Sequence, residues 1–178
     1  MLYANIESEI MDQMIANSGE TLTQISFAQP VMLVFLRQFG CVFCREALTD
    51  IATKRKEIEE SGTRIVFVHM TDNEIADRYF QRYNLEEVLH ISDPKCLYYT
   101  AFGLLKNRMT QLLNLQFFIR GFQATAIEGH FPGASLGDDF QMPGVFIIQE
   151  GAIRDRFVHK LAYDRPNYTE LIKCCTIA

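Results

Sequence analysis

The stretch VMLVFLRQFGCVFCREAL, residues 31–48, decides the fold of this protein. It opens with a continuous apolar run, residues 31–36, which has the length and β-branched character of a strand buried on both faces of a sheet. Cys41 and Cys44 follow, and residues 42–61 then repeat apolar side chains at helical spacing. The order strand, Cys-X-X-Cys, helix predicts that Cys41 lies at a helix N-terminus, where unpaired amides and the helix dipole favour a thiolate.

The rest of the chain alternates strands with helices. Strands are expected at residues 64–70, 88–92, 144–150 and 152–159, and helices at residues 2–14, 72–84 and 165–175. The segment TLTQISF, residues 21–27, is a further candidate strand. Strands separated by helices indicate a mainly parallel core sheet. Because no linker, repeat or low-complexity tract divides the chain, we expect a single domain over residues 1–178.

Composition and charge limit the classes of function. A chain of 178 residues can bury a hydrophobic core without disulfides. The formal net charge of −5, with acidic and basic residues mixed, argues against nucleic acid as a partner. No apolar run approaches the roughly 18 residues of a membrane span, and no secretory leader opens the chain, so we expect a soluble, cytoplasmic protein that binds no membrane. The five cysteines have uneven spacings, unlike a secreted disulfide framework, and a close pair in a cytosolic chain is more often catalytic or metal-binding.

The pair Cys41 and Cys44 has three interpretations: a redox couple, half of a metal site, or two packing residues. In a redox couple, Cys41 would attack and Cys44, one turn into the helix, would resolve the mixed disulfide. A zinc site needs four ligands, and the sequence lacks a second pair at ligand spacing, so we expect no metal and no other cofactor. Packing alone is disfavoured because open sheets hold their reactive groups at the carboxyl ends of strands. Arg37 and Arg45 flank the pair and either favour the thiolate or are solvated surface charges.

Other candidate residues lie further along the chain. His69 ends a strand at the same edge of the sheet, and it either shuttles a proton to a leaving thiolate or is a hydrogen-bonded structural histidine. Pro143, in QMPGVFII, begins a strand, where a proline needs no ladder partner. The remaining thiols, Cys96, Cys174 and Cys175, are most simply buried or spare, because adjacent cysteines close a strained ring.

Six segments together resemble the peroxiredoxin-like branch of the thioredoxin superfamily, which is related to the alkyl hydroperoxide reductase/thiol-specific antioxidant group and to selenoprotein L. They are VMLVFLRQFGCVFCREAL, RIVFVHM, ISDP, YYTAFGL, QMPGVFIIQEGAI and YDRPNY. The resemblance implies an α/β, thioredoxin-like fold with a central mixed, mostly parallel sheet flanked by helices. It also implies an N-terminal extension and an insert before a cis-proline loop, in which Met142 and Pro143 bind the substrate.

The sequence departs from this family's pattern at the residues that activate peroxide. Typical members carry a threonine three residues before the peroxidatic cysteine and an arginine near the strand after position 143. Here Cys41 stands in place of the threonine, Cys44 aligns with the peroxidatic cysteine, and Pro143 stands where the arginine would be. Compared with thioredoxin, Phe35 replaces the buried carboxylate and Gly40 replaces the tryptophan before the first cysteine.

The resemblance implies a thiol-disulfide oxidoreductase of peroxiredoxin-like type, acting in antioxidant or redox-homeostasis chemistry through a redox-active Cys41–Cys44 disulfide. Its partners would be a thiol reductant such as thioredoxin or glutathione and a disulfide or hydroperoxide substrate, with a homodimer as a possible assembly. One alternative is a thiol peroxidase in which Cys44 is peroxidatic and Cys41 resolves it. Another is a non-catalytic binding module, which the aromatic-rich segment 97–141 suggests, although aromatic side chains at this density commonly fill a core.

Overall fold

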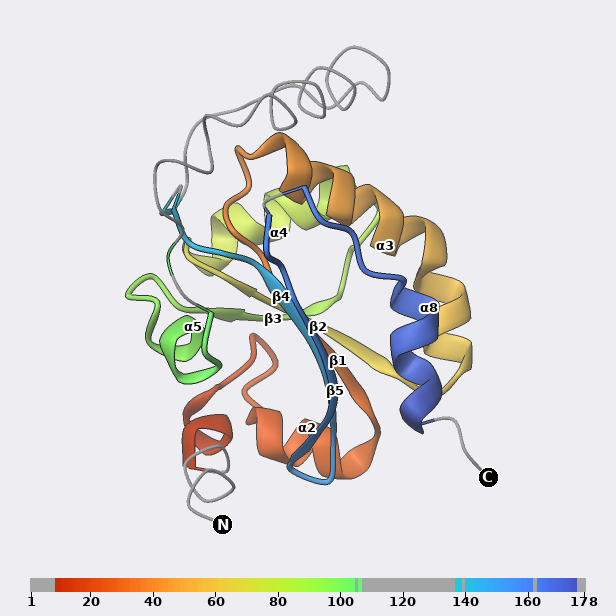
Figure 1. The fold of residues 1–178 in the computed structure, drawn as a ribbon. Helices are drawn as coiled ribbons and strands as arrows, with labels where there is room; N and C mark the ends of the chain where they lie inside the picture. Colours follow the sequence, from red (N-terminus) through yellow and green to blue (C-terminus); the bar gives the residue numbers. More distant parts are fainter. Residues whose placement is uncertain (1–8, 105, 107–136, 139, 162, 176–178) are drawn as a thin grey trace.

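A computed structural model describes residues 9–104, 106, 137–138, 140–161 and 163–175. In this part of the chain, a five-stranded sheet with the order β3-β2-β1-β4-β5 is covered by helices on both faces (Figure 1). The strands are β1 (Val31–Phe35), β2 (Arg64–His69), β3 (Leu89–Ser92), β4 (Gly144–Gln149) and β5 (Ala152–Val158). The helices are α2 (Leu22–Ala28), α3 (Val42–Glu60), α4 (Asn73–Arg82), α5 (Leu97–Ala101) and α8 (Tyr168–Leu171), followed by the 3₁₀ helix η2 (Ile172–Cys175).

The sheet is mixed, as the fold class predicts. Strands β1, β2 and β3 run parallel to one another, whereas β4 pairs antiparallel with β1 and β5 pairs antiparallel with β4. Parallel and antiparallel pairings are therefore equally represented among the described strands. The parallel half brings the carboxyl ends of β1, β2 and β3 to one edge, where the candidate residues lie. Within the described residues, no helix has both the length and the apolar character needed to cross a membrane.

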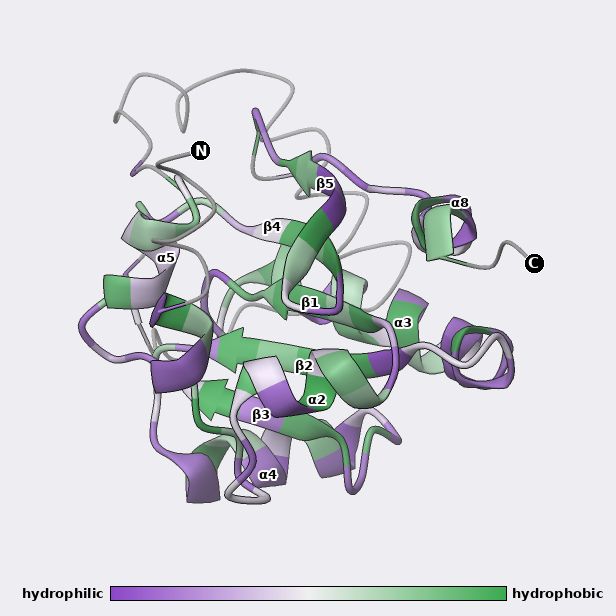
Figure 2. Ribbon diagram, turned by 90° about the horizontal axis from the view of Figure 1, so that it is seen from below, coloured by the Kyte–Doolittle hydropathy of each residue, from purple (hydrophilic) through white to green (hydrophobic). Residues whose placement is uncertain are grey.

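Strand β1 lies at the centre of the sheet and contributes to two hydrophobic cores. Val31, Leu33 and Phe35 pack into a core with residues of α2 and α5, while Met32 and Val34 pack into a core with residues of α3, α4 and α8. Every residue of β1 is buried, which explains its unbroken apolar run. Figure 2 shows hydrophobic colours along β1 and β2 and a hydrophilic stretch on the edge strand β5.

Residues 22–28 form helix α2, not the strand expected at residues 21–27. The Thr21 hydroxyl accepts a hydrogen bond from the Gln24 amide at 3.2 Å, and the Gln24 side chain accepts one from the Thr21 amide at 2.9 Å. This reciprocal capping box pairs two backbone amides at the start of the helix. The Thr-X-X-Gln spacing is the sequence signal that identifies this helix start, and it outweighs the strand preference of the β-branched residues.

The helices expected at the two ends of the chain differ from the expectation in different ways. Residues 9–13 are helical, and residues 2–8 of the expected first helix lie outside the described residues. The last helix begins at Tyr168, later than the sequence predicts, because Asn167 is its N-cap and accepts a hydrogen bond from the Glu170 amide at 3.3 Å. The expected insert before Pro143 also lies mostly outside the described residues, including Phe117, Phe118 and Phe122 of the aromatic segment.

Candidate active site

The turn that leads from β1 into α3 carries both cysteines. Its backbone is fixed by the Phe39 ring, which stacks on Tyr79 at a centroid distance of 4.7 Å and meets Phe80 edge-on at 5.5 Å. The Phe39 carbonyl also accepts a hydrogen bond from Arg45 Nε at 2.9 Å. Cys41 is the N-cap residue of α3, so its sulfur lies at the start of a 19-residue helix, as the sequence predicts. The loop is thus anchored from α3 and α4, which fixes where Cys41 is presented.

The two cysteines are free thiols with different environments. Cys41 is partly exposed, whereas Cys44 is only 5% exposed. The pKa of Cys41 falls from 9.0 to about 6, chiefly because the Cys44 side chain forms a hydrogen bond with its sulfur. Burial opposes this shift, and the Arg37 charge and the Phe43 and Cys44 amides reinforce it. The same hydrogen bond and burial raise the pKa of Cys44 well above its ordinary value. At neutral pH the pair therefore holds one thiolate, at Cys41, beside one protonated thiol.

The two flanking arginines have different roles. Arg37 is buried, and its Nη1 atom lies 3.9 Å from the Cys41 sulfur, where its positive charge lowers the pKa of that thiol. Arg45 instead bonds the Phe39 carbonyl and places its guanidinium 5.9 Å from the centre of the Tyr79 ring. Of the two, Arg37 is the residue whose charge acts on the thiolate, and Arg45 holds the loop.

The peptide bond between Met142 and Pro143 is trans, not cis as the resemblance implies. Trans is the intrinsically favoured form of an X-Pro bond, by about 0.5–1 kcal/mol. The Pro143 carbonyl accepts a hydrogen bond from the His159 amide at 3.4 Å, which continues the β4–β5 pairing by one step. The Met142 side chain is buried, and its carbonyl receives a long contact of 3.5 Å from the Gln141 amide group. A role for Met142 and Pro143 in substrate binding stays a prediction.

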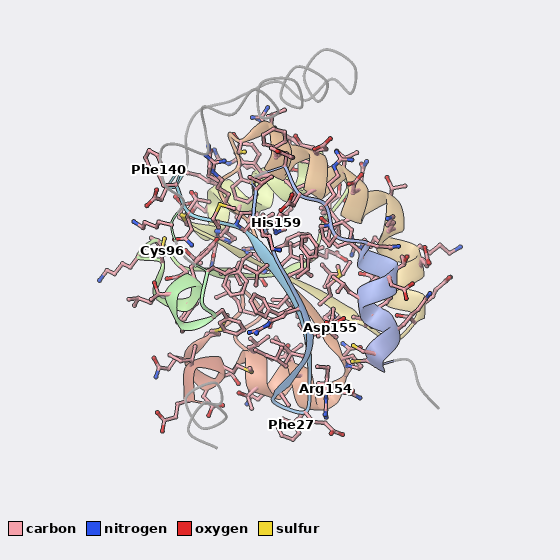
Figure 3. All side chains as sticks on the ribbon, viewed as in Figure 1. Phe27, Cys96, Phe140, Arg154, Asp155 and His159 are labelled. Carbon is pink, nitrogen blue, oxygen red and sulfur yellow. The ribbon has the colours of Figure 1, made fainter. Side chains whose placement is uncertain are left out.

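A small pocket brings Pro143 together with Cys44. Its volume is about 20 Å³, enough for about one water molecule, and His159 and Tyr163 also line it. The His159 Nδ1 atom is buried and has no hydrogen-bond partner among the described residues, and burial lowers the pKa of His159 to about 4. Figure 3 shows His159 at the end of β5, next to the strand that Pro143 precedes. The buried sulfur thus faces a narrow space lined by aromatic rings and a neutral imidazole.

An ion pair joins two of the segments that line this pocket. Glu46 on α3 is 2% exposed and pairs with Arg165, which also lies 3.5 Å from the Asp50 carboxylate. Tyr163, two residues earlier, packs its ring 6.1 Å from the Phe43 ring, next to Cys41. The segment after β5 is therefore fastened across the first turns of α3, close to both cysteines.

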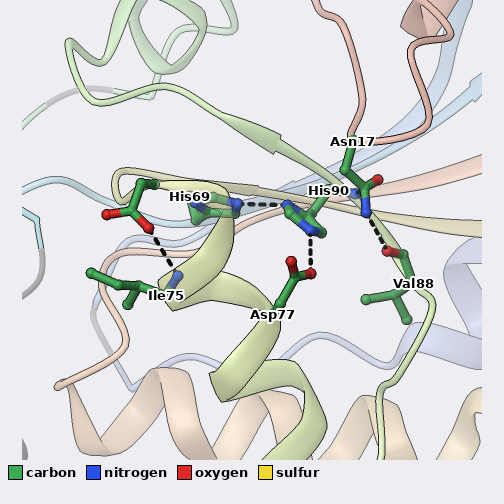
Figure 4. A network of polar contacts seen from close by, with 7 residues as sticks. Asn17, His69, Ile75, Asp77, Val88 and His90 are labelled. Atoms are coloured by element: carbon green, nitrogen blue, oxygen red, sulfur yellow. Dashed lines mark hydrogen bonds and ion pairs between the residues drawn. The ribbon is translucent and has the colours of Figure 1, made fainter.

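His69 belongs to a separate polar network at the same edge of the sheet. Its Nε2 atom lies 2.9 Å from His90 Nδ1, and His90 Nε2 lies 2.9 Å from an Asp77 carboxylate oxygen (Figure 4). Since the carboxylate can only accept, His90 donates to Asp77 and accepts from His69, which leaves His69 Nδ1 as an acceptor without a partner among the described residues. Asn17 accepts a hydrogen bond from the His90 amide at 3.1 Å. This geometry supports the hydrogen-bonded structural interpretation of His69.

The other three cysteines lie away from the pair. Cys96 is buried in the core with α5, on the opposite face of the sheet from α3 (Figure 3). Cys174 and Cys175 lie in η2 at the end of the described chain. Within the described ranges, no three histidine, cysteine, aspartate or glutamate side chains are grouped to hold a metal ion.

Several residues of this site carry no recognisable signal in the sequence. His159, Tyr163 and Arg165 follow the last strand and reach the cysteines only because β5 pairs antiparallel with β4. The one available hint is YDRPNY, which belongs to the family resemblance and contains two of the three. Glu46 looks like an ordinary exposed helix residue, and its burial is accompanied by an ion pair with Arg165, which is distant in sequence. The arrangement as a whole can perform two-electron thiol chemistry, because an accessible thiolate adjoins a second thiol.

One family model and several solved structures are similar to this chain. The AhpC/TSA family model matches residues 11–156. Reduced Prx3 from Vibrio vulnificus, solved in complex with H₂O₂, is similar in structure with a TM-score of 0.62 and 16% identity over 90% of this chain and 92% of that one. Peroxidoxin BcpB from Mycobacterium tuberculosis has a TM-score of 0.60 and 12% identity over 92% and 88% of the two chains.

A longer relative and the curated proteins complete the comparison. A mutant of peroxiredoxin 6 from Arenicola marina has a TM-score of 0.60 and 10% identity over 89% of this chain, which spans only 66% of that protein. At such low identity, these structures show that the folds are alike. The sequence matches none of the curated proteins with which it was compared.

Proposed function

Because this chain belongs to the AhpC/TSA family, we propose that it is a thiol-dependent peroxidase whose Cys41–Cys44 pair reduces a hydroperoxide. The observation that carries the proposal is the partly exposed Cys41 thiolate, which adjoins the buried, protonated Cys44 thiol. The proposal also takes residues 1–178 as one domain that works in the cytoplasm, where cellular thiols keep cysteines reduced.

The reaction proceeds in three balanced steps. The thiolate attacks one oxygen of the hydroperoxide, the O–O bond breaks, and the departing alkoxide takes up a proton, which leaves a cysteine sulfenic acid. The second thiol then displaces that oxygen as water and closes the Cys41–Cys44 disulfide. A thiol reductant such as thioredoxin or glutathione supplies two electrons and two protons, and so restores both thiols.

The geometry favours Cys41 as the sulfur that attacks first. It is the more accessible of the two, and its lowered pKa makes it the thiolate at neutral pH. Cys44 is buried, and its raised pKa keeps it protonated until the partner sulfur has been oxidised. The opposite order is supported by the family pattern, in which Cys44 aligns with the peroxidatic cysteine. Both orders produce the same disulfide, so they differ only in the intermediate.

Trapping the intermediate tests the function and the order together. Reduced protein is treated with one equivalent of hydroperoxide, and a sulfenic-acid probe is mapped in Cys41→Ser and Cys44→Ser variants, with Cys96→Ser as the control. We expect Cys44→Ser to consume peroxide and carry the probe on Cys41, and Cys41→Ser to react far more slowly. A probe on Cys44 of Cys41→Ser, formed at the wild-type rate, would reverse the order but keep the function.

A second candidate function is reduction of disulfides without peroxide chemistry. It is supported by the apolar side chains beside Cys41, where the partly exposed Val42 and Tyr163 pack against the buried Phe43, because partly exposed apolar side chains can contact a protein partner. Peroxide consumption and reduction of an insulin-type disulfide should therefore be measured on the same sample. Turnover of the disulfide with no peroxide consumption would replace the peroxidase proposal, and turnover of neither would favour a non-catalytic binding module.

A further inference from the structure

A second pair of sulfurs lies outside the site described above. Cys174 and Cys175 end the 3₁₀ helix η2, which follows α8 and packs against β5 (Figure 1). Helix α8 itself packs beside the middle of α3, where Lys54 Nζ lies 5.8 Å from the centre of the Tyr168 ring. This pair therefore lies well along α3 from its N-terminus, where Cys41 and Cys44 are placed.

The two sulfurs lie close together, and one of them is open to solvent. Their Sγ atoms are 3.6 Å apart. Cys174 is exposed, and its thiol bonds the Leu171 carbonyl at 3.2 Å, whereas Cys175 is partly buried against the core that also holds α3 and α8. The Cys175 side chain is thereby fixed by packing, and the Cys174 thiol is held beside it by its own helix.

This pair is poorly suited to form a disulfide. Consecutive Cα atoms across a trans peptide lie about 3.8 Å apart, which is shorter than the roughly 4.4 Å that disulfides usually require. Oxidation to an internal disulfide would therefore strain the backbone of η2. Strain of this kind disfavours the disulfide relative to one formed by a pair with relaxed spacing.

The same spacing suits two bonds to one thiophilic atom. With bonds of about 2.3 Å, the length of zinc–thiolate bonds, sulfurs 3.6 Å apart subtend roughly 100° at the central atom. That angle fits pyramidal or tetrahedral bonding better than the linear arrangement of a two-coordinate ion. The number of available ligands favours the pyramidal geometry over the tetrahedral one. Among the described residues, no group of three or more histidine, cysteine, aspartate or glutamate side chains could hold a metal ion. A tetrahedral metal would need two further ligands, whereas a monosubstituted trivalent arsenical needs two sulfurs only.

We propose that Cys174 and Cys175 form a chelating dithiol that binds monosubstituted trivalent arsenicals. In the binding step, two S–As bonds form, two As–O bonds break, and the two thiol protons leave with the oxygens as water. Arsenic stays trivalent and no electron is transferred, so the step needs no oxidant. The dithiol is independent of the peroxidase proposal, since it shares no residue with the Cys41–Cys44 site.

Retention of phenylarsine oxide in the presence of excess glutathione tests this site. The test uses the full chain with Cys44→Ser, because the Cys41–Cys44 pair could itself chelate the probe. Intact-protein mass spectrometry should show one retained phenylarsine per chain, which a small dithiol removes. Adding Cys174→Ser should weaken retention about 100-fold, since a second, intramolecular bond commonly contributes that factor. Adding Cys96→Ser should change nothing.

Two results would overturn the proposal. The first is a phenylarsine adduct that persists unchanged when Cys174→Ser is added. The second is the absence of a retained adduct when thiol labelling shows that Cys174 and Cys175 are both reduced. Because Cys174 is exposed, its serine variant should fold as the parent does, and a circular dichroism spectrum checks this. Cys175→Ser provides the second test of the same pair.

Discussion

The Arg37 Nη1 atom lies 3.9 Å from the Cys41 sulfur, and the Arg37 Nε atom is buried without a hydrogen-bond partner among the described residues. A buried cation beside a sulfur is stabilised when that sulfur is an anion, and the anion is stabilised in turn. The two residues come from opposite ends of one turn, Arg37 just after β1 and Cys41 at the start of α3. This turn therefore contains both the nucleophile and a cation that favours its reactive form.

The reactivity of Cys41 should titrate with a midpoint near pH 6, and two substitutions should raise that midpoint by different amounts. Cys44→Ala should raise the pKa of Cys41 most, since the Cys44 hydrogen bond is the largest cause of its lowering, and Arg37→Gln should raise it less. Cys44→Ser keeps a donor and should resemble the wild type. The measurement is the rate of alkylation of Cys41 against pH, read from the labelled peptide. Arg78→Gln, at an exposed position, is the control, and an ordinary thiol pKa for wild-type Cys41 would refute the thiolate assignment.

Acid should destabilise the protein through His69. Burial, followed by the neighbouring His90, lowers the pKa of His69 to about 3, whereas an unfolded histidine titrates near 6.5. Between these values the unfolded state binds more protons, so the stabilisation is complete above pH 6.5 and is lost as the pH falls toward 3. For each additional proton that the unfolded state binds, the free energy of unfolding falls by about 1.4 kcal/mol for every unit by which the pH is lowered. His159, with its pKa lowered to about 4, acts in the same direction.

Chemical denaturation at about pH 7 and about pH 5 measures this effect. His69→Gln should reduce the number of protons taken up on unfolding by about one, and so make the free energy of unfolding depend less steeply on pH. The contribution of His159 should remain. The variant is also expected to be less stable at neutral pH, because the hydrogen bond to His90 is altered. An unchanged pH dependence in His69→Gln would show that His69 does not titrate as the structure indicates.

Removing the Arg165 charge should destabilise the protein more than removing an exposed charge. Arg165→Met removes one charged partner of the buried Glu46 carboxylate, and we expect the free energy of unfolding to fall by about 2–3 kcal/mol. Arg154→Met breaks the exposed 3.2 Å pair with Glu150 and should change it by less than about 0.5 kcal/mol. The double variant Glu46→Gln, Arg165→Met should recover part of the loss. If Arg165→Met and Arg154→Met changed the free energy of unfolding equally, the burial of Glu46 would not strengthen the effect of losing its ion pair.

Phe35 should be among the most sensitive positions of the core. Its side chain is 1% exposed, and its ring lies 4.9 Å from Tyr99, 5.0 Å from Phe102 and 5.6 Å from Phe146. Phe35→Ala should therefore lower the free energy of unfolding by about 3–5 kcal/mol. The matched control is Phe27→Ala, at a position 64% exposed near the β4–β5 turn (Figure 3), where we expect little change. Denaturant midpoints measure both, and a comparable loss in the control would contradict the packing argument.

The local pattern of the sequence predicts most of the fold. Strand β1 is recognisable because its five residues are apolar on both faces, and α3 because its apolar residues recur at helical spacing beside Cys41. Both features depend on residues near one another in the chain, so they can be read without tertiary information. Helix α2 is the exception, since its β-branched residues also suit a strand and only the capping box at Thr21 marks the start of a helix.

The sequence by itself determined that a thiol pair follows a buried strand and opens a helix, and the family resemblance supplied the thioredoxin-like fold. Only the tertiary structure decided which arginine lies close to the Cys41 sulfur, because Arg37 and Arg45 both flank the cysteine pair in the sequence. In the structure, Arg37 lies beside that sulfur, whereas Arg45 bonds the Phe39 carbonyl. The tertiary structure also brings His159 into the pocket that Cys44 lines, although the two residues are more than a hundred positions apart in the sequence. It likewise brings His69 within hydrogen-bonding distance of His90. Such contacts depend on strand pairing between distant segments, which local propensity and spacing do not encode.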